Sequence, residues 1–388
     1  MSRELPEPLV PWTLDERTAA VVRAEPGSWL REDMTDILRG LEGAASLLAN
    51  GPARLKLQVL GICELLRERS REAWFTDPAK AVEFAELAVL LADRLDEEHY
   101  GAGMVAEERA RAWAYLGNAL RITSDLRRAE EALQTSEEVY GRSGDDAFTE
   151  AEIRSFKASL RNAQGRFEEA VDLLDPLIEV CHDSRDFQGE GRALIKKAMS
   201  LSYAGRQAEA LRVIRRGVKK IDPEKEPALT VAAHHNLIGY LNELGRHEEA
   251  LAELEAARKL FEELGQGTQL IRLRWLEGRI FLGLGSLEAA EHALLDARQG
   301  FVARHRGFGA AFVALDLAIL YLRQGKHQDI KQLVAEMVPI FESRDIRQEA
   351  LAAFLLFRRA AEAEKLTLAL IRELAGSLER LGRGAEGW

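Results

Sequence analysis

Apolar residues in the central part of the chain recur at the spacing of α-helices, and short polar turns separate one helix from the next. Val171, Leu174 and Ile178 follow one another at intervals of three and four residues, and the segment 251–260 repeats the pattern. This spacing places an apolar stripe along one side of a helix with 3.6 residues per turn. Alanine, leucine, glutamate and arginine are abundant, and all four lose little conformational freedom in a helix. The sequence therefore predicts a series of amphipathic helices.

The predicted helices belong to a repeat of 40 residues. Glycine marks each copy at Gly165, Gly205, Gly245, Gly285 and Gly325, and five positions later come Ala170, Ala210, Ala250, Ala290 and Ile330. Glycine ends a helix because it adopts the left-handed backbone conformation without steric cost. The small alanine lets the following helix approach closely. Each copy is therefore a helix, a tight turn and a second helix, and such pairs must stack because one pair cannot bury both of its faces.

The pattern continues on both sides of these five copies. Upstream, Trp113, Leu116, Gly117 and Leu120 are followed by Ala129 and Leu133, with Ser124-Asp125 as the turn. Earlier still, Asp77 and Pro78 predict a helix start with Asp77 as the N-cap. Downstream, one more period reaches Lys365, where the glycine is absent but the apolar pattern persists. We therefore predict about eight helix pairs between Leu55 and Leu381.

The segment from Trp113 to Leu133 resembles the signature of the tetratricopeptide repeat (TPR) family, and the later copies extend the resemblance over most of the chain. The period of 40 residues is longer than the family's 34. The resemblance implies an all-α, right-handed superhelical solenoid of antiparallel helix pairs. Repeats of this length look like those of bacterial TPR peptide receptors and of motor or polarity adaptors.

The two ends of the chain differ from the repeats. Prolines at positions 6, 8, 11 and 26 predict an extended arm over residues 1–28. An apolar stripe predicts a capping helix over 29–54, before the solenoid of 55–381. The final residues, 382–388, are expected to form a flexible tail.

Charge and cysteine content exclude several functional classes. A formal net charge of −11 argues against nucleic-acid binding, which needs a basic surface. Cys63 and Cys181 are the only cysteines, so there is no disulfide framework and no zinc-ligand spacing. No signal peptide and no membrane-spanning stretch is recognisable. We expect a cytoplasmic protein with reduced, buried thiols and no membrane partner.

Sequence motifs for catalysis are lacking. There is no phosphate-binding Walker loop, no dinucleotide fingerprint and no nucleophile elbow. The pairs His234-His235 and Cys181-His182 are adjacent on a helix, so their side chains point about 100° apart and do not converge on one ion. His247 begins a zinc-protease-like motif, but the second histidine is missing. We expect a protein that is not an enzyme and that has no metal and no cofactor.

The TPR resemblance also indicates which side chains line the inner face of the solenoid. The family's groove positions select Arg111, Asn118, Arg121, Asn162, Arg192, Tyr203, His235, Asn242, Arg272, Trp275 and Arg279 as candidate partner-binding residues. The same positions hold Met199, Phe312, Leu315, Ile319 and Arg323. Six of these residues are arginines and none is a lysine, although the chain as a whole is acidic.

Two interpretations of this face remain open. Arginine binds carboxylates through two parallel hydrogen bonds, asparagine can bind a peptide backbone, and Trp275 and Tyr203 can anchor apolar side chains. The face would then bind an acidic or amphipathic segment of a partner. Alternatively, the arginines pair with neighbouring glutamates and Trp275 is packed between helices. Towards the C-terminus, core packing is the favoured explanation for Phe312 and Leu315.

These observations predict a non-enzymatic bacterial scaffold or regulator that binds a segment of a partner protein in its concave groove. Sequestration of a regulatory protein such as a sigma factor is one version of this function. The alternative is a receptor for a short signalling peptide. Residues 1–50 are too short and too acidic to read DNA, so such a receptor would need its effector from elsewhere. The sequence does not indicate the partner's identity or the oligomeric state.

Overall fold

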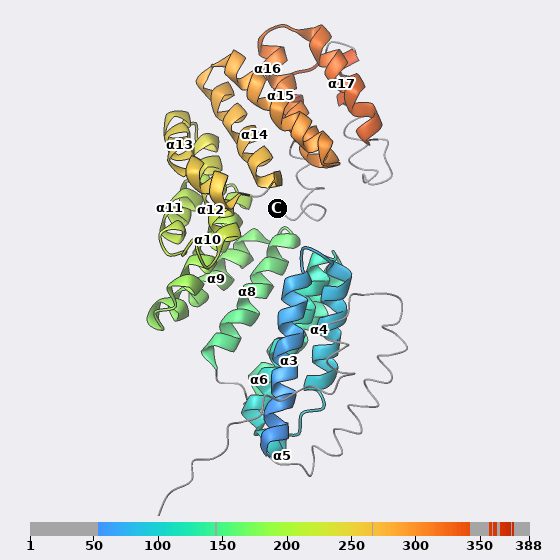
Figure 1. The fold of residues 1–388 in the computed structure, drawn as a ribbon, viewed down its shortest axis with the longest axis vertical. Coiled ribbons are helices and arrows are strands. Elements are labelled where there is room, and N and C mark those ends of the chain that lie inside the picture. Colours follow the sequence, from blue (N-terminus) through green and yellow to red (C-terminus); the bar gives the residue numbers. More distant parts are fainter. Residues whose placement is uncertain are drawn as a thin grey trace, which may run out of the picture.

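The computed structural model describes residues 53–143, 146–265, 267–341, 357–358, 360–362, 365–373 and 375. The predicted arm, the capping helix up to residue 52, the tail and much of the eighth helix pair lie outside these residues. Within them the chain forms α-helices joined by short turns (Figure 1). The first four pairs are α3 (Ala53–Ala73) with α4 (Pro78–Ala92), α6 (Ala102–Ile122) with α7 (Leu126–Ser143), α8 (Ala147–Ala163) with α9 (Phe167–Asp183), and α10 (Phe187–Tyr203) with α11 (Gln207–Val218).

Three more pairs complete the described stack. They are α12 (Pro227–Glu243) with α13 (His247–Leu264), α14 (Gly267–Leu284) with α15 (Leu287–Ala303), and α16 (Gly307–Arg323) with α17 (His327–Phe341), and the one-turn helix α5 (Glu97–Tyr100) precedes α6. The first helices α8, α10, α12, α14 and α16 begin at residues 147, 187, 227, 267 and 307, which confirms the period of 40 residues.

The first helix of each pair lies on the inner side of the curve. Each first helix packs against its own second helix and against the first helix of a neighbouring pair, as in α6 with α8, α10 with α12, and α12 with α14. Each second helix packs mainly against the first helices on either side of it. Elements on the inside of a curved stack approach one another more closely, so the first helices form the concave layer. Figure 1 shows the pairs following this curve from α3 and α6 at one end to α16 and α17 at the other.

The turn residues have the backbone conformations that the repeat predicts. The five turn glycines have φ angles between 69° and 80°, and Ser124 adopts the same region with φ of 65° in the turn of its pair. After the first four of these glycines, the alanines at 170, 210, 250 and 290 are fully buried, and Ile330 is buried in the fifth copy. The predicted cap is also present, because the side chain of Asp77 accepts a hydrogen bond from the backbone N–H of Lys80.

Close packing between paired helices explains Gly117. A Cβ atom at this position would lie 2.6 Å from Cγ of Leu133 on the second helix. Only glycine lets α6 and α7 approach to this distance, since real Cβ atoms do not make such short contacts.

The core is distributed along the stack as a series of apolar clusters between the two helical layers. Cys63 and Cys181 are free and buried, as predicted, and burial raises the pKa of the Cys63 thiol to about 12. At the C-terminal end, Phe312 and Leu315 are buried in the core cluster that also contacts Trp275, so core packing accounts for these two residues. Among the helices of the described residues, none combines the length and apolar character needed to cross a membrane.

Candidate functional site

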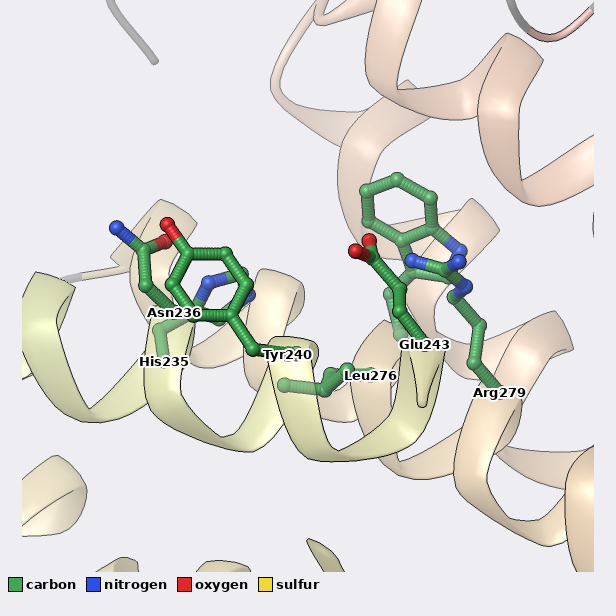
Figure 2. A pocket seen from close by; sticks show the side chains of 8 residues that line it. His235, Asn236, Tyr240, Glu243, Leu276 and Arg279 are labelled. Atoms are coloured by element: carbon green, nitrogen blue, oxygen red, sulfur yellow. The ribbon is translucent and has the colours of Figure 1, made fainter. Parts of the chain in front are cut away.

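The inner face of α12 and α14 contains a small pocket with a volume of about 100 Å³. The helix α12 contributes His235, Asn236, Gly239, Tyr240 and Glu243, and α14 contributes Trp275, Leu276 and Arg279. Figure 2 shows the labelled side chains of the two helices facing the same space, with Glu243 and Arg279 pointing towards each other. Pockets for whole small ligands usually measure about 300–1,000 Å³. The pocket therefore has the size for one side chain of a larger partner.

Trp275 is held in place from behind by α16. Its indole N–H donates a hydrogen bond of 2.6 Å to the carboxylate of Asp316, and its ring stacks on Phe312 with ring centroids 6.0 Å apart. Burial raises the pKa of Asp316, while Arg279 at 3.8 Å and the indole N–H act in the opposite direction. The indole is thus fixed in one orientation before any partner binds, which lowers the entropic cost of using it as an anchor.

His235 supplies the polar group of the pocket. Burial lowers the pKa of its imidazole to about 4, and the positive charges of Arg272 and Arg279 lower the pKa further. The ring is therefore neutral at neutral pH. Its Nε2 atom is buried and has no hydrogen-bond partner in the described part of the chain. A neutral imidazole with an unused nitrogen can bind a peptide N–H or C=O, depending on its tautomer.

A second group of polar residues lies where α6, α8 and α10 meet. Arg121 of α6 donates to the side-chain oxygen of Asn118 at 3.0 Å. Lys196 of α10 donates to Oγ of Ser155 on α8 at 2.7 Å and to the carbonyl oxygen of the same residue at 3.0 Å. The amide nitrogen of Asn162 donates to Ser200 at 2.9 Å, while its oxygen is buried and lacks a partner among the described residues. Two predicted residues, Arg121 and Asn162, are therefore brought together with Lys196.

The remaining arginines of the inner face follow the second interpretation offered by the sequence. Arg111 pairs with Glu108 at 3.1 Å and with Asp146 at 2.7 Å. Arg192 pairs with Glu226 at the start of the next helix pair. These ion pairs link successive pairs of the stack. Arg323 does not form such a pair but donates to the carbonyl oxygen of Leu282 at 3.0 Å.

The other predicted residues lie at varied places. Arg272 lies close enough to His235 to influence its pKa. The ring of Tyr203 packs against Phe167, with centroids 5.6 Å apart. Asn242 is buried, and its side-chain oxygen lies 2.8 Å from Nδ1 of His247 at the start of α13, so it joins the two helices of its own pair. Whether these residues contact a partner stays a prediction.

Sequence reasoning missed several residues that line these sites. They are Asn236, Gly239, Tyr240 and Leu276 of the pocket and Lys196 of the polar group. Helical spacing could have found some of them. Lys196 lies four residues after Arg192 and three before Met199, and Gly239 lies four after His235. A fixed set of five groove positions skips these neighbours on the same helical stripe.

No protein-family model matches the sequence, and no curated protein matches it. Solved structures do match the fold. A Rap protein complexed with Competence and Sporulation Factor aligns with a TM-score of 0.57 at 15% identity, covering 86% of this chain and 89% of that one. The apo form of the quorum sensor NprR from B. thuringiensis gives a TM-score of 0.57 at 15% identity, covering 83% and 94%. Both matched proteins are helical repeat proteins of the TPR type. The chain has the TPR fold.

Two further matches show what proteins with this TPR fold are named for. NprR in complex with its cognate peptide NprX aligns with a TM-score of 0.50 at 14% identity, covering 85% of this chain and 96% of that one. Aspartyl phosphate phosphatase F from Bacillus subtilis aligns with a TM-score of 0.55 at 13% identity, covering 85% and 88%. At these identities the likeness establishes the TPR solenoid and leaves the function to the residues of the inner face.

Proposed function

We propose that this TPR solenoid is a non-enzymatic regulator that binds an extended segment of a partner along its inner face, with the α12–α14 pocket receiving one side chain. The observation that carries the proposal is the pocket itself. It combines an aromatic ring fixed by Asp316 with a buried His235 nitrogen that has no partner among the described residues.

The chemistry of the pocket suits a peptide. Binding hot spots are rich in tryptophan, tyrosine and arginine, and Trp275, Tyr240 and Arg279 line this pocket together. Leaving a buried polar atom without a hydrogen bond costs about 1–3 kcal/mol, and a peptide group can satisfy it. A peptide supplies a side chain for the cavity and backbone groups for the imidazole at the same time.

The names of the matched structures support binding over catalysis only in part. One is a complex with a peptide, but another is a phosphatase, so the TPR fold is compatible with both roles. In the described residues, no group of three or more histidine, cysteine or acidic side chains could hold a metal ion. The inner face offers binding groups, and we place the chain among the binding proteins.

Two kinds of partner fit this proposal. The first is a protein, for example a sigma factor or another regulatory protein sequestered in a bacterial cytoplasm. The second is a short signalling peptide, which is favoured by the small pocket and by the peptide complex of NprR. In either case the bound segment is expected to carry an apolar side chain for the pocket and a negative charge.

Affinity capture with matched variants tests the proposal. The full chain is immobilised and incubated with extract of the source cell, and retained proteins and peptides are identified by mass spectrometry. Trp275→Ala and Arg279→Glu should lose a partner that the wild type retains. Arg127→Glu is the control, because Arg127 is highly exposed on the second helix α7 and pairs only locally with Glu131.

The outcome also separates the two kinds of partner. Retention of a stoichiometric protein supports sequestration, whereas retention of one short peptide supports the receptor function. If both pocket variants fold and retain the same partner as the wild type, binding in the α12–α14 pocket is refuted.

A further inference from the structure

The inner face contains two positive charges that differ from its other cations in their surroundings. Arg111, Arg192 and Arg279 all have a carboxylate within 4.0 Å. Within the described residues, neither Arg121 nor Lys196 has one, and their hydrogen bonds go to neutral oxygens of Asn118 and Ser155. In a chain with a net charge of −11, nearby carboxylates are abundant. Their absence from this place is therefore informative.

Both cations are poorly solvated. Arg121 and Lys196 lie between three first helices, and burial is the main cause that lowers their pKa values, to about 10 and about 7. The charge of Arg121 lies close enough to Lys196 to contribute to the second shift. Burying a charge without an opposite charge costs several kcal/mol, and placing two like charges together adds to that cost. A bound anion would remove much of this cost.

The neighbouring asparagine indicates what kind of anion fits. Asn162 donates to Ser200, whose hydroxyl in turn donates to the carbonyl oxygen of Lys196 at 3.1 Å, so the amide lies one helical turn from the lysine. The Asn162 oxygen is buried with its acceptor capacity unused among the described residues. An isolated inorganic anion offers no donor to this oxygen. A peptide does, because a backbone N–H lies next to its terminal or side-chain carboxylate.

We infer that Arg121, Lys196 and Asn162 form a subsite for a carboxylate of the bound peptide segment, with the two cations binding the carboxylate and Asn162 accepting a hydrogen bond from an adjacent backbone N–H. The inference rests on the proposed function, because it specifies the charge and one contact of the segment that the inner face binds. The subsite lies on α6, α8 and α10, whereas the apolar pocket lies on α12 and α14. An extended segment along the inner face therefore contacts both.

Peptide pools that differ in one group provide the test. The full chain is immobilised and offered three pools of random hexapeptides: one with a free C-terminal carboxylate, one with a carboxamide, and one with a carboxamide and a phosphoserine. Retained peptides are quantified by mass spectrometry. We expect preferential retention of peptides with a carboxylate, either at the terminus or on Asp and Glu side chains, and the first two pools separate these two sources.

Variants then connect the preference to the subsite. Lys196→Met and Arg121→Gln should each weaken carboxylate-containing peptides by about tenfold, as expected for the loss of one charge-assisted hydrogen bond. Lys197→Met is the matched control, because Lys197 is the adjacent lysine on α10 but pairs with Asp175 of α9. Trp275→Ala should weaken all three pools alike. Preference for the phosphoserine pool, or a carboxylate preference that survives both subsite variants, would overturn the inference.

A small-anion measurement keeps this test independent of whether a hexapeptide binds. The pKa of Lys196 is followed by NMR of its side-chain 13C signals, assigned by their loss in Lys196→Met. Acetate should raise this pKa relative to chloride at equal ionic strength, and Arg121→Gln should reduce the effect. If no pool binds but acetate raises the pKa, the short-peptide form of the proposed function fails and the carboxylate subsite stands. If acetate leaves the pKa unchanged, the carboxylate subsite is refuted.

Discussion

Replacement of Lys196 by methionine removes one buried positive charge with little change in side-chain volume. The lysine ammonium lies next to Ser155 of α8, and the charges of Arg121 on α6 and Arg192 on its own helix act on it. Each of these neighbours is neutral or positive. We therefore expect Lys196→Met to stabilise the folded chain, which is an unusual result for the loss of two hydrogen bonds.

The magnitude follows from opposing contributions. Burial lowers the lysine pKa from 10.5 to about 7, and each pKa unit corresponds to about 1.4 kcal/mol. The residue retains partial exposure, so solvent screening reduces this penalty considerably. The two lost hydrogen bonds to Ser155 offset roughly a further 1–2 kcal/mol. A net gain of about 1 kcal/mol in the free energy of unfolding remains at pH 6.5.

The sign of the pH dependence distinguishes this explanation from simple repacking. Between the folded pKa of about 7 and the unfolded pKa of 10.5, the unfolded chain binds more protons than the folded chain at Lys196. The stability contributed by this group therefore rises with pH across that window, and the wild type approaches the methionine variant. Arg121 loses its charge only near the upper end of the window, since its own pKa is about 10.

Denaturant unfolding followed by circular dichroism at several pH values between 6 and 9 measures the difference between the two proteins. Lys197→Met again serves as the control, because its lysine is paired with Asp175 and should show no gain in stability. A methionine variant that is less stable than the wild type at pH 6.5, or a difference that does not shrink as the pH rises, would refute the reasoning.

Two further predictions concern packing and a buried ion pair. Gly117→Ala should lower the free energy of unfolding by about 1–3 kcal/mol, because the new methyl group would overlap Leu133; Gly141→Ala, with open space around it, should not destabilise. Arg67→Met should cost about 3–5 kcal/mol, since it leaves the buried Glu108 without Arg67 as its partner. The double variant Arg67→Met with Glu108→Leu should recover much of this loss, and denaturant unfolding of all four proteins decides both predictions.

The repeat could be predicted because single residues encode its turns. A glycine at the left-handed position and a small residue five positions later act within one helix pair, and no knowledge of the remaining chain is needed. Gly245 and Ala250 show this directly, with a φ of 73° and complete burial. The same holds for Asp77, whose capping hydrogen bond reaches only three residues along the chain.

The chemistry of the inner face was harder to predict because it depends on contacts between helix pairs. Arg111 meets Asp146 across 35 residues, and Arg192 meets Glu226 across 34. Both partners lie at the start of the following first helix, and only the superhelical arrangement brings them within reach. The sequence therefore left open which arginines are neutralised. It also missed Lys196, whose importance comes from the carboxylate that its surroundings lack.

Two bases whose charged forms are disfavoured lie on this concave layer, and the same physical cause acts on both. Burial lowers the pKa of Lys196 with Arg121 and Arg192 nearby, and burial lowers the pKa of His235 with Arg272 and Arg279 nearby. In each case an adjacent guanidinium adds to the desolvation. A negatively charged segment along the inner face would oppose both shifts, so its binding should raise both pKa values and take up protons near neutral pH. Affinity for an acidic segment should therefore increase as the pH falls from about 8 to 6, and a chain with Lys196→Met should lose much of this dependence.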